Sequence, residues 1–312
     1  LLAIEHLLLG QPMRRRFEAD PAVMATSLLL QERIPRTAAG YLHATEFAEA
    51  TTAVPVPEAR LRLFTEPDRS RPAVQLLSNG RYHVMVTSAG GGYSRRNTMA
   101  VTRWREDITR DAHGMFCYLR DPESGEVWTT SYQPVGRRTE RFEAIFSESR
   151  AEFRVRQRGF ETHTEIVVSP EDDIELRRTR VTNHGRSRRT IELTSYAEVV
   201  LADPIGDAMH PAFSKLFVTT EIVREMQALL CKRRPRSADE QVPWMCHLVA
   251  VHDADVDAIS YETDRSQFIG RGRSTARPAA LDPGVSSLSG SDGAVLDPIV
   301  SIRVRVTLDP GQ

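Results

Sequence analysis

The residues best suited to ligand chemistry lie together in the segment 75–111. A run of three glycines, residues 90–92, follows an alternating stretch, and a short Gly run at a strand end lets the backbone approach another surface closely. The run is not a GxGxxG motif and precedes no helical pattern, which argues against dinucleotide binding. Directly behind it, aromatic side chains alternate with arginines, and this group comprises Tyr93, Arg95, Arg96, Arg103, Trp104 and Arg105.

Aromatic rings and guanidinium groups together suit a sugar site. The ring faces stack on the CH groups of a pyranose, and guanidinium groups donate paired hydrogen bonds to hydroxyls or phosphate. The alternative is structural: the tryptophan packs in a loop while the arginines pair with Glu106, Asp107 and Asp111. The residues alone leave both interpretations open.

Other chemistry finds little support. The sequence contains no GxSxG or HExxH motif, and its adjacent acids fit turns better than the opposed carboxylates of a glycosidase. His163 and Glu165 share a strand face, but no third metal ligand is evident, so a structural pair is expected. The three cysteines have no paired spacing. We therefore predict no catalytic residue, no metal site and no cofactor in this chain.

Composition narrows the function classes. The 312 residues are 40% hydrophobic and carry 41 basic against 42 acidic side chains, for a net charge of −1. This balance argues against a nucleic-acid partner, and no apolar run is long enough to cross a membrane. Of the basic residues 39 are arginine, and we expect most of them on a solvated sheet face, paired with glutamates of neighbouring strands.

The elements that must position these side chains are predicted to be mainly strands. Period-two alternation begins near residue 74 and recurs every 8 to 15 residues, which is typical of an antiparallel sandwich or barrel. Residues 270–297 are predicted to be a long loop. The expected strands are 81–88, 115–120, 126–133, 141–147, 151–157, 160–169, 174–183, 190–200, 213–221, 228–232, 246–251 and 299–307. Residues 1–36 are predicted to be helical, and the proline-rich stretch 37–72 to be a linker.

Several long segments together resemble one family. They include LLLQERIPR (28–36), QLLSNGRYHVMVTSAGGGYS (75–94), AVTRWREDITRD (100–111), YLRDPESGEVWTTSYQP (118–134), ETHTEIVVSPEDDIELRR (161–178) and HPAFSKLFV (210–218). The chain is similar to the cyclic β-1,2-glucan synthases, at the start of their phosphorylase-like C-terminal module, which belongs with the cellobiose and chitobiose phosphorylases. Residues 1–36 resemble the tail of the preceding glucoamylase-like module.

The resemblance implies a fold and a role. The fold is a large antiparallel β-sandwich of the galactose-mutarotase type, a supersandwich, spanning residues 73–312 and truncated at its C-terminal end. It implies an (α/α)6 barrel farther along the parent chain, which carries the general acid. The expected partner is a β-1,2-glucan or gluco-oligosaccharide, and a homodimer is left open. The implied parent spans the inner membrane several times, with this segment on the cytoplasmic side.

The resemblance also selects site residues. Sandwich loops of related phosphorylases approach the active-site cleft, which implies substrate binding by Gly91, Gly92, Tyr93, Ser94, Arg95, Arg103 and Trp104. One departure is that the family commonly has Ser-Arg-Trp-Asn where this chain has Arg96 in place of the tryptophan. The expected function is a carbohydrate-binding module that positions a glucan for the barrel, and the alternative is a scaffold or subunit contact that touches no sugar.

Overall fold

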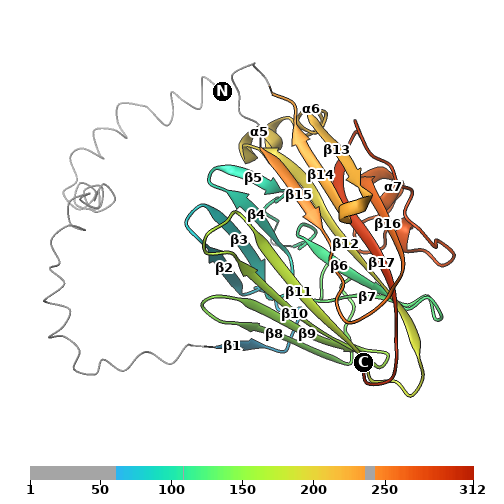
Figure 1. The fold of residues 1–312 in the computed structure, drawn as a ribbon. Helices are drawn as coiled ribbons and strands as arrows, with labels where there is room; N and C mark the ends of the chain where they lie inside the picture. The colour runs from blue at the N-terminus through green and yellow to red at the C-terminus, as the bar shows by residue number, and fades with distance from the viewer. Residues whose placement is uncertain (1–60, 108, 236–242) are drawn as a thin grey trace, which may run out of the picture. The chain divides into compact units, whose positions relative to one another are not determined.

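The computed structural model describes residues 61–107, 109–235 and 243–312. The described part belongs to one compact unit, residues 59–312. The predicted helical segment 1–36 and most of the predicted linker lie outside the described residues. Figure 1 shows that the regular structure of the described unit is mainly antiparallel strands. The mainly β sandwich expected from the alternating pattern is confirmed.

One layer is a five-stranded sheet in the order β1-β8-β9-β10-β11. Its strands are β1 (Arg62–Phe64), β8 (Arg141–Phe146), β9 (Ala151–Gln157), β10 (Phe160–Val168) and β11 (Glu175–Asn183). Along β10, buried and half-buried residues alternate strictly through the first seven positions. This period of two places one face in the core and the other toward solvent. Strand β1 lies within the range predicted as linker and pairs with β8.

The second layer is a nine-stranded sheet in the order β16-β17-β12-β5-β4-β3-β2, to which β6 and β7 add beside β12. Its strands are β2 (Val74–Ser78), β3 (Tyr82–Thr87), β4 (Gly92–Arg96), β5 (Met99–Thr102), β6 (Phe116–Arg120), β7 (Val127–Thr129), β12 (Arg189–Ala202), β16 (Val256–Asp264) and β17 (Pro298–Leu308). The long strand β12 pairs with β17, β5 and β6, and thereby joins the two halves of this sheet.

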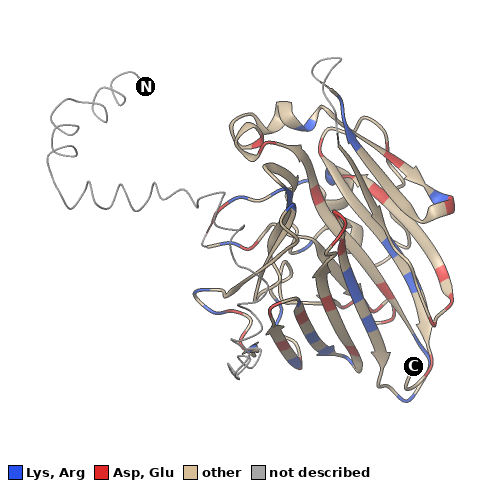
Figure 2. Cartoon of the chain, turned by 60° about the vertical axis from the view of Figure 1, so that its left-hand side comes forward, with Lys and Arg blue, Asp and Glu red and all other residues tan. Residues whose placement is uncertain are grey.

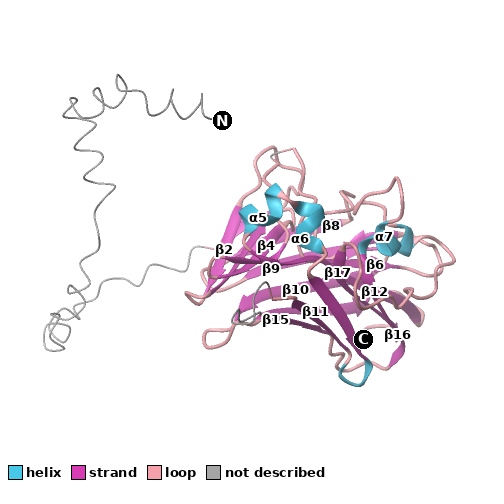
Figure 3. Ribbon diagram, turned by 90° about the horizontal axis from the view of Figure 1, so that it is seen from above, coloured by secondary structure: helices cyan, strands magenta, loops and turns pink. Residues whose placement is uncertain are grey.

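A third, three-stranded sheet and short helices complete the unit. The sheet contains β13 (Val218–Val223), β14 (Ala228–Arg233) and β15 (Trp244–Leu248). The helices are α5 (Pro204–Met209), α6 (Pro211–Lys215) and α7 (Arg265–Ile269), with 3-10 turns η2 (Arg224–Met226) and η3 (Ala279–Leu281). Figure 3 shows α5, α6 and α7 on one side of the strands.

The main core joins the inner faces of the first two layers. Trp128 of the large sheet stacks against Phe160 of the five-stranded sheet with ring centroids 6.4 Å apart, and both are almost fully buried. A smaller apolar cluster covers the other face of the large sheet, where Tyr196 meets Phe268 of α7 at 4.9 Å. Each such side chain stabilises the fold by about 2 to 3 kcal/mol relative to an exposed one.

The strand predictions need one correction. Residues 213–221 were predicted as a strand, but Phe213 lies in helix α6 and strand β13 begins at Val218. His210 precedes Pro211 at the first helical position, where a missing N–H costs nothing, so the turn starts a helix. The predicted loop 270–297 is confirmed as mostly irregular, with η3 within it. Strands β1, β2, β4, β5 and β16 were not predicted.

The predicted pairing of arginines with glutamates is confirmed on the five-stranded sheet. Acidic and basic bands cross its strands in Figure 2, and Arg178 pairs with Glu165 of the adjacent strand. Arg150 also reaches Glu165, at 3.3 Å. Elsewhere the arginines are not all on a solvated face, because four of those that the structure describes are buried, namely Arg103, Arg120, Arg233 and Arg303. A buried guanidinium requires acceptors inside the protein, so these residues form internal networks.

Candidate functional site

Strand β4 divides the central candidate segment between two surfaces. Its side chains alternate, so Tyr93 and Arg95 point to one face and Ser94 and Arg96 to the other. Ser94 is buried, and its hydroxyl donates to the Glu175 carboxylate of the five-stranded sheet over 2.5 Å. Tyr93 and Arg95 therefore lie on the face of the large sheet that points away from the five-stranded sheet.

Arg96 lies on the opposite face of the same strand, where it forms an ion pair. Its Nε donates to Asp173 over 2.6 Å. A side chain at position 96 thus lies on the opposite strand face from Tyr93 and Arg95. The departure from the common family tryptophan consequently falls outside the surface those two residues form.

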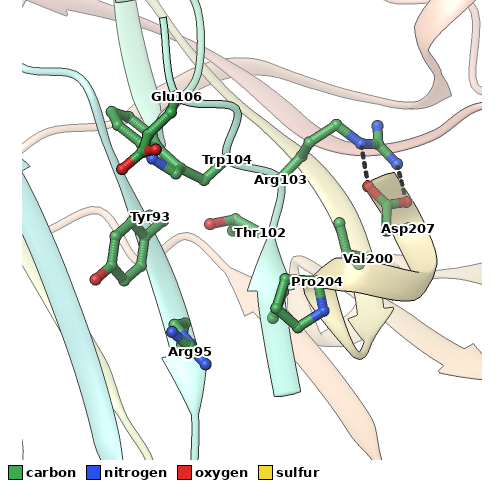
Figure 4. A pocket seen from close by; sticks show the side chains of 10 residues that line it. Tyr93, Arg95, Thr102, Arg103, Trp104, Glu106, Val200, Pro204 and Asp207 are labelled. Carbon is green, nitrogen blue, oxygen red and sulfur yellow. Dashed lines mark hydrogen bonds and ion pairs between the residues drawn. The ribbon is translucent and has the colours of Figure 1, made fainter. Parts of the chain in front are cut away.

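A cavity of about 230 Å³ lies on the Tyr93 face, between β4, β5 and the start of α5 (Figure 4). Helix α5 is held in place by Asp203, whose carboxylate accepts from the N–H groups of Ile205 and Gly206. Because Asp and Pro begin the helix well, the chain turns sharply after β12 and brings its first turn over the cavity. The lining residues are Tyr93, Arg95, Ala100, Thr102, Arg103, Trp104, Glu106, Val200, Pro204 and Asp207.

Two aromatic rings form one wall of the cavity. Tyr93 and Trp104 meet edge to face, with ring centroids 5.8 Å apart and an interplanar angle of 60°. Both residues are half-buried, so each keeps part of its surface in contact with solvent. An aromatic corner of this kind offers apolar surface for the CH groups of a sugar ring.

The side chain of Arg103 lines the cavity but is almost fully buried. Its side chain is 5% exposed and donates to Glu198 at 2.6 Å and to both oxygens of Asp207 at 3.2 Å. Arg105 adds a second bond to Asp207 at 2.9 Å. Burial alone would raise the pKa of Glu198, but the charges of Arg265 and Arg103 hold it at about 2. The guanidinium of Arg103 thus positions α5 against β12 and has its donors engaged internally.

Arg95 has no comparable partner. None of the ion pairs formed by residues that the structure describes involves it, and its Nε is buried without a hydrogen-bond acceptor. Its one side-chain bond is a long one, 3.5 Å from Nη2 to the carbonyl of Thr98. This guanidinium lies in the cavity wall with most of its donors unused.

The glycines support the site without entering it. A Cβ at Gly92 would lie 1.9 Å from the Met85 carbonyl oxygen on the neighbouring strand, and one at Gly91 would lie 3.2 Å from Asp111. Both residues are buried. The run of glycines therefore permits close backbone packing, as the sequence suggested.

A second polar cluster lies on the outer face of the five-stranded sheet. Glu152 lies opposite Glu165 in the β9–β10 register, and its carboxylate accepts a bond of 2.8 Å from His163 Nε2. Possible ligand atoms of the three residues lie within 4.8 Å of one another. The sequence analysis missed this third carboxylate, which cross-strand register alone reveals. Arg150 and Arg178 already neutralise the two carboxylates, so the cluster fits an ion-pair network better than a cation site.

The structure brings four of the seven predicted substrate-binding residues together. Tyr93, Arg95, Arg103 and Trp104 line one cavity, whereas Gly91, Gly92 and Ser94 do not. Sequence reasoning missed Thr102, Val200, Pro204 and Asp207 as lining residues. The sequence Asp203-Pro204 could have been recognised as a helix start. The position of that helix beside residue 103, however, depends on the pairing of β12 with β5.

None of the helices among the described residues is long and apolar enough to span a membrane.

Comparison with known proteins now identifies the family. Residues 57–312 match the family described as glycosyl hydrolase 94, supersandwich domain. The chain belongs to this supersandwich family. The predicted resemblance to glucan synthases and disaccharide phosphorylases is thereby confirmed.

Among the similar proteins are a glucan synthase and disaccharide phosphorylases. The chain is 37% identical over 313 aligned residues to the cyclic β-(1,2)-glucan synthase NdvB of Rhizobium meliloti, covering 99% of this chain and 11% of that protein. It is 27% identical to the N,N'-diacetylchitobiose phosphorylase of Vibrio furnissii and 25% identical to the solabiose phosphorylase of Paenibacillus borealis, covering 80% of this chain and 32% of each. The chain thus spans about a tenth of the synthase and a third of each phosphorylase.

Proposed function

We propose that this supersandwich domain is a carbohydrate-binding module that holds a β-glucan chain in the Tyr93–Trp104 cavity and positions it for a catalytic barrel elsewhere in the parent protein. The observation that carries the proposal is the half-exposed aromatic corner with polar groups around it. Tyr93 and Trp104 offer apolar ring surface, while Thr102, Arg95 and Glu106 offer hydrogen-bonding groups. The named relatives, a glucan synthase and two disaccharide phosphorylases, act on sugars, which supports the ligand class.

Catalysis is not part of the proposal. The two acids of the cavity are poorly matched for it, because Asp207 is bound to Arg103 and Arg105, and Glu106 is exposed. The chain is expected to bind sugar and to show no turnover of its own.

Calorimetric titration of the 312-residue chain with linear β-1,2-gluco-oligosaccharides tests the proposal. We expect Trp104→Ala to weaken binding by about tenfold or more, because it removes one wall of the aromatic corner. The matched control is Trp244→Ala, since Trp244 is an exposed tryptophan on β15 that does not line the cavity. A flat titration at millimolar sugar, or equal losses in both variants, would overturn it.

A scaffold role is the second candidate, and one surface favours it. Helices α5 and α6, with the residue that ends α6, expose four large apolar side chains within twelve residues, namely Ile205, Met209, Phe213 and Leu216. Exposed apolar groups at this density are typical of a protein contact. If this role is the main one, Met209→Ser with Phe213→Ser in the full-length parent protein will impair its activity or its assembly as a dimer, while Trp104→Ala will not.

We also propose that the domain is a segment of a longer membrane-associated synthase and lies on the cytoplasmic side of the inner membrane. The match to the glucan synthase covers 99% of this chain but 11% of that protein, which supports a longer parent, and the location follows from what the family resemblance implies. Protease accessibility in right-side-out and inverted vesicles of the parent protein tests it. Protection of the domain in inverted vesicles would contradict it.

A further inference from the structure

Arg95 is the cation of the cavity whose charge no protein group balances. The carboxylates of Asp173 and Glu175 are engaged by other arginines, and Glu106, the unpaired acid of the cavity, lies at its opposite end. Asp173 is bound to Arg96 at 2.6 Å on the far side of the strand. Glu175 accepts from Arg177 over 2.6 Å and from Ser94 over 2.5 Å.

Asp207, a carboxylate on another side of the cavity, is also bound to arginines. Both oxygens of Asp207 accept from Arg103, and one also accepts from Arg105. A guanidinium has five N–H donors, and the one side-chain bond of Arg95 leaves most of them free. Because its Nε is shielded from solvent and unpaired, Arg95 gains more from an incoming acceptor than an exposed arginine would.

The cavity is also polarised from end to end. In Figure 4, Glu106 lies beside Trp104 at one end, and Arg95 lies at the other, beyond Tyr93. Glu106 has no ion-pair partner among the described residues. A ligand with a negative group at one end and hydroxyls at the other therefore has one favourable orientation, with the anion toward Arg95 and the hydroxyls toward Glu106.

Size limits the ligand further. A cavity of about 230 Å³ is smaller than the pockets of several hundred Å³ that enclose drug-sized ligands, and it suits a single sugar ring. The aromatic corner can pack against the sugar ring, but it provides no negative group to balance the charge of Arg95.

We propose that Arg95 makes this cavity selective for a sugar unit that carries an anionic substituent, a phosphate or a carboxylate. The guanidinium donates two parallel hydrogen bonds to the anion, and the ring of the sugar lies against Tyr93 and Trp104. The inference rests on the proposed carbohydrate-binding function and adds the charge class of the ligand. Paired charge-assisted hydrogen bonds are expected to give a preference of about 10-fold to 100-fold over the neutral sugar.

The test compares three sugars that differ at one carbon. The 312-residue chain is titrated at constant ionic strength with glucose, glucose 6-phosphate and glucuronate, and with inorganic phosphate alone. We expect at least one anionic sugar to bind about tenfold or more tightly than glucose, and the preferred one identifies the substituent. Phosphate alone should bind far more weakly than the preferred sugar, because it gains nothing from the aromatic corner.

Two variants connect the preference to Arg95. Arg95→Gln should reduce the ratio of anionic-sugar affinity to glucose affinity to about one, whereas Arg95→Lys should retain part of the preference, because the charge remains and the paired geometry is lost. Arg96→Gln is the matched control, since Arg96 lies on the same strand but opposite face and pairs with Asp173. Thermal melts of all variants confirm that they are folded.

The outcomes separate this inference from the proposed function. If glucose binds as tightly as both anionic sugars, or if Arg95→Gln keeps the preference, the inference is overturned and sugar binding stands. If inorganic phosphate binds as tightly as the sugar phosphate, the site is a plain anion site and the inference is also overturned. If none of the sugars or the longer oligosaccharides binds, both fail together.

Discussion

The guanidinium of Arg103 donates to Glu198 over 2.6 Å, and the two side chains are only 5% and 8% exposed. The same guanidinium reaches Asp207 in α5, so one side chain joins strand β12 to the helix that roofs the cavity. The backbone N–H of Arg103 also donates to the Glu198 carbonyl at 3.0 Å. Removal of one partner would leave a charge buried without compensation.

Replacement of Arg103 should therefore be costly. We expect Arg103→Met to lower the free energy of unfolding by about 3 to 5 kcal/mol, because Glu198 and Asp207 each lose a buried neutralising partner. Urea denaturation of the 312-residue chain measures this loss. Arg138→Met is the control, since its pair with Asp68 is exposed to solvent and should contribute little to stability. Equal losses in the two variants would contradict the structural role of Arg103.

Acid should weaken the same network through Glu198. Burial opposes the charged form, yet Arg265 and Arg103 lower the pKa of Glu198 from 4.5 to about 2. A lowered folded-state pKa contributes stability that is fully present above pH 4.5 and is lost as the pH falls toward 2. The loss is of the order of 3 kcal/mol. Urea denaturation between pH 5 and 2.5 should show a shallower decline in Glu198→Gln than in the wild type, and parallel curves would refute the assignment.

The sandwich was predictable because short stretches of sequence are enough to identify many of its strands. Strand β9 alternates apolar and polar residues from Ala151 to Arg156, buried residues recur at every second position in β8 and through most of β10, and short turns separate these strands. Strands β4 and β5 were missed because they are short, and β4 consists of glycine, polar and arginine residues that carry no apolar alternation. Helix α6 was mistaken for a strand because it is only five residues long, which is too short for a helical repeat to stand out in the sequence.

The candidate site was only partly predictable, for a related reason. Tyr93, Arg95 and Trp104 are close in sequence, so composition alone revealed them. The carboxylates that decide the role of each arginine are remote: Glu198 and Asp207 follow Arg103 by 95 and 104 positions. Sequence therefore predicted that arginines gather here, but only the fold separates the engaged Arg103 from the unpaired Arg95.

Gly92 should be intolerant of any side chain. A Cβ at this position would lie 1.9 Å from the Met85 carbonyl oxygen, which belongs to the strand paired with β4. We expect Gly92→Ala to lower the free energy of unfolding by about 3 kcal/mol or more, because the strands must separate to admit the methyl group. Gly206→Ala in α5 is the control: no atom lies within 4 Å of its Cβ position, and alanine favours helix, so it should be neutral or slightly stabilising. A thermal melt of each variant separates the two cases.

His247 should impose a second pH dependence at higher pH. Its Nε2 lies 2.8 Å from the Ser195 hydroxyl, between β15 and β12. Burial lowers the pKa of His247 from 6.5 to about 4. The neutral imidazole is therefore the folded form, so this residue's contribution to stability is fully present above pH 6.5 and declines as the pH falls toward 4.

The decline is at most about 3 kcal/mol, since the residue keeps some contact with solvent. His247→Gln removes the titrating group and keeps a hydrogen-bonding side chain for Ser195. Urea denaturation of this variant and the wild type at half-unit steps from pH 7 to 4 should give curves that converge, because the wild type loses stability faster. Curves that keep a constant separation across this range would show that His247 does not titrate in the folded domain as described.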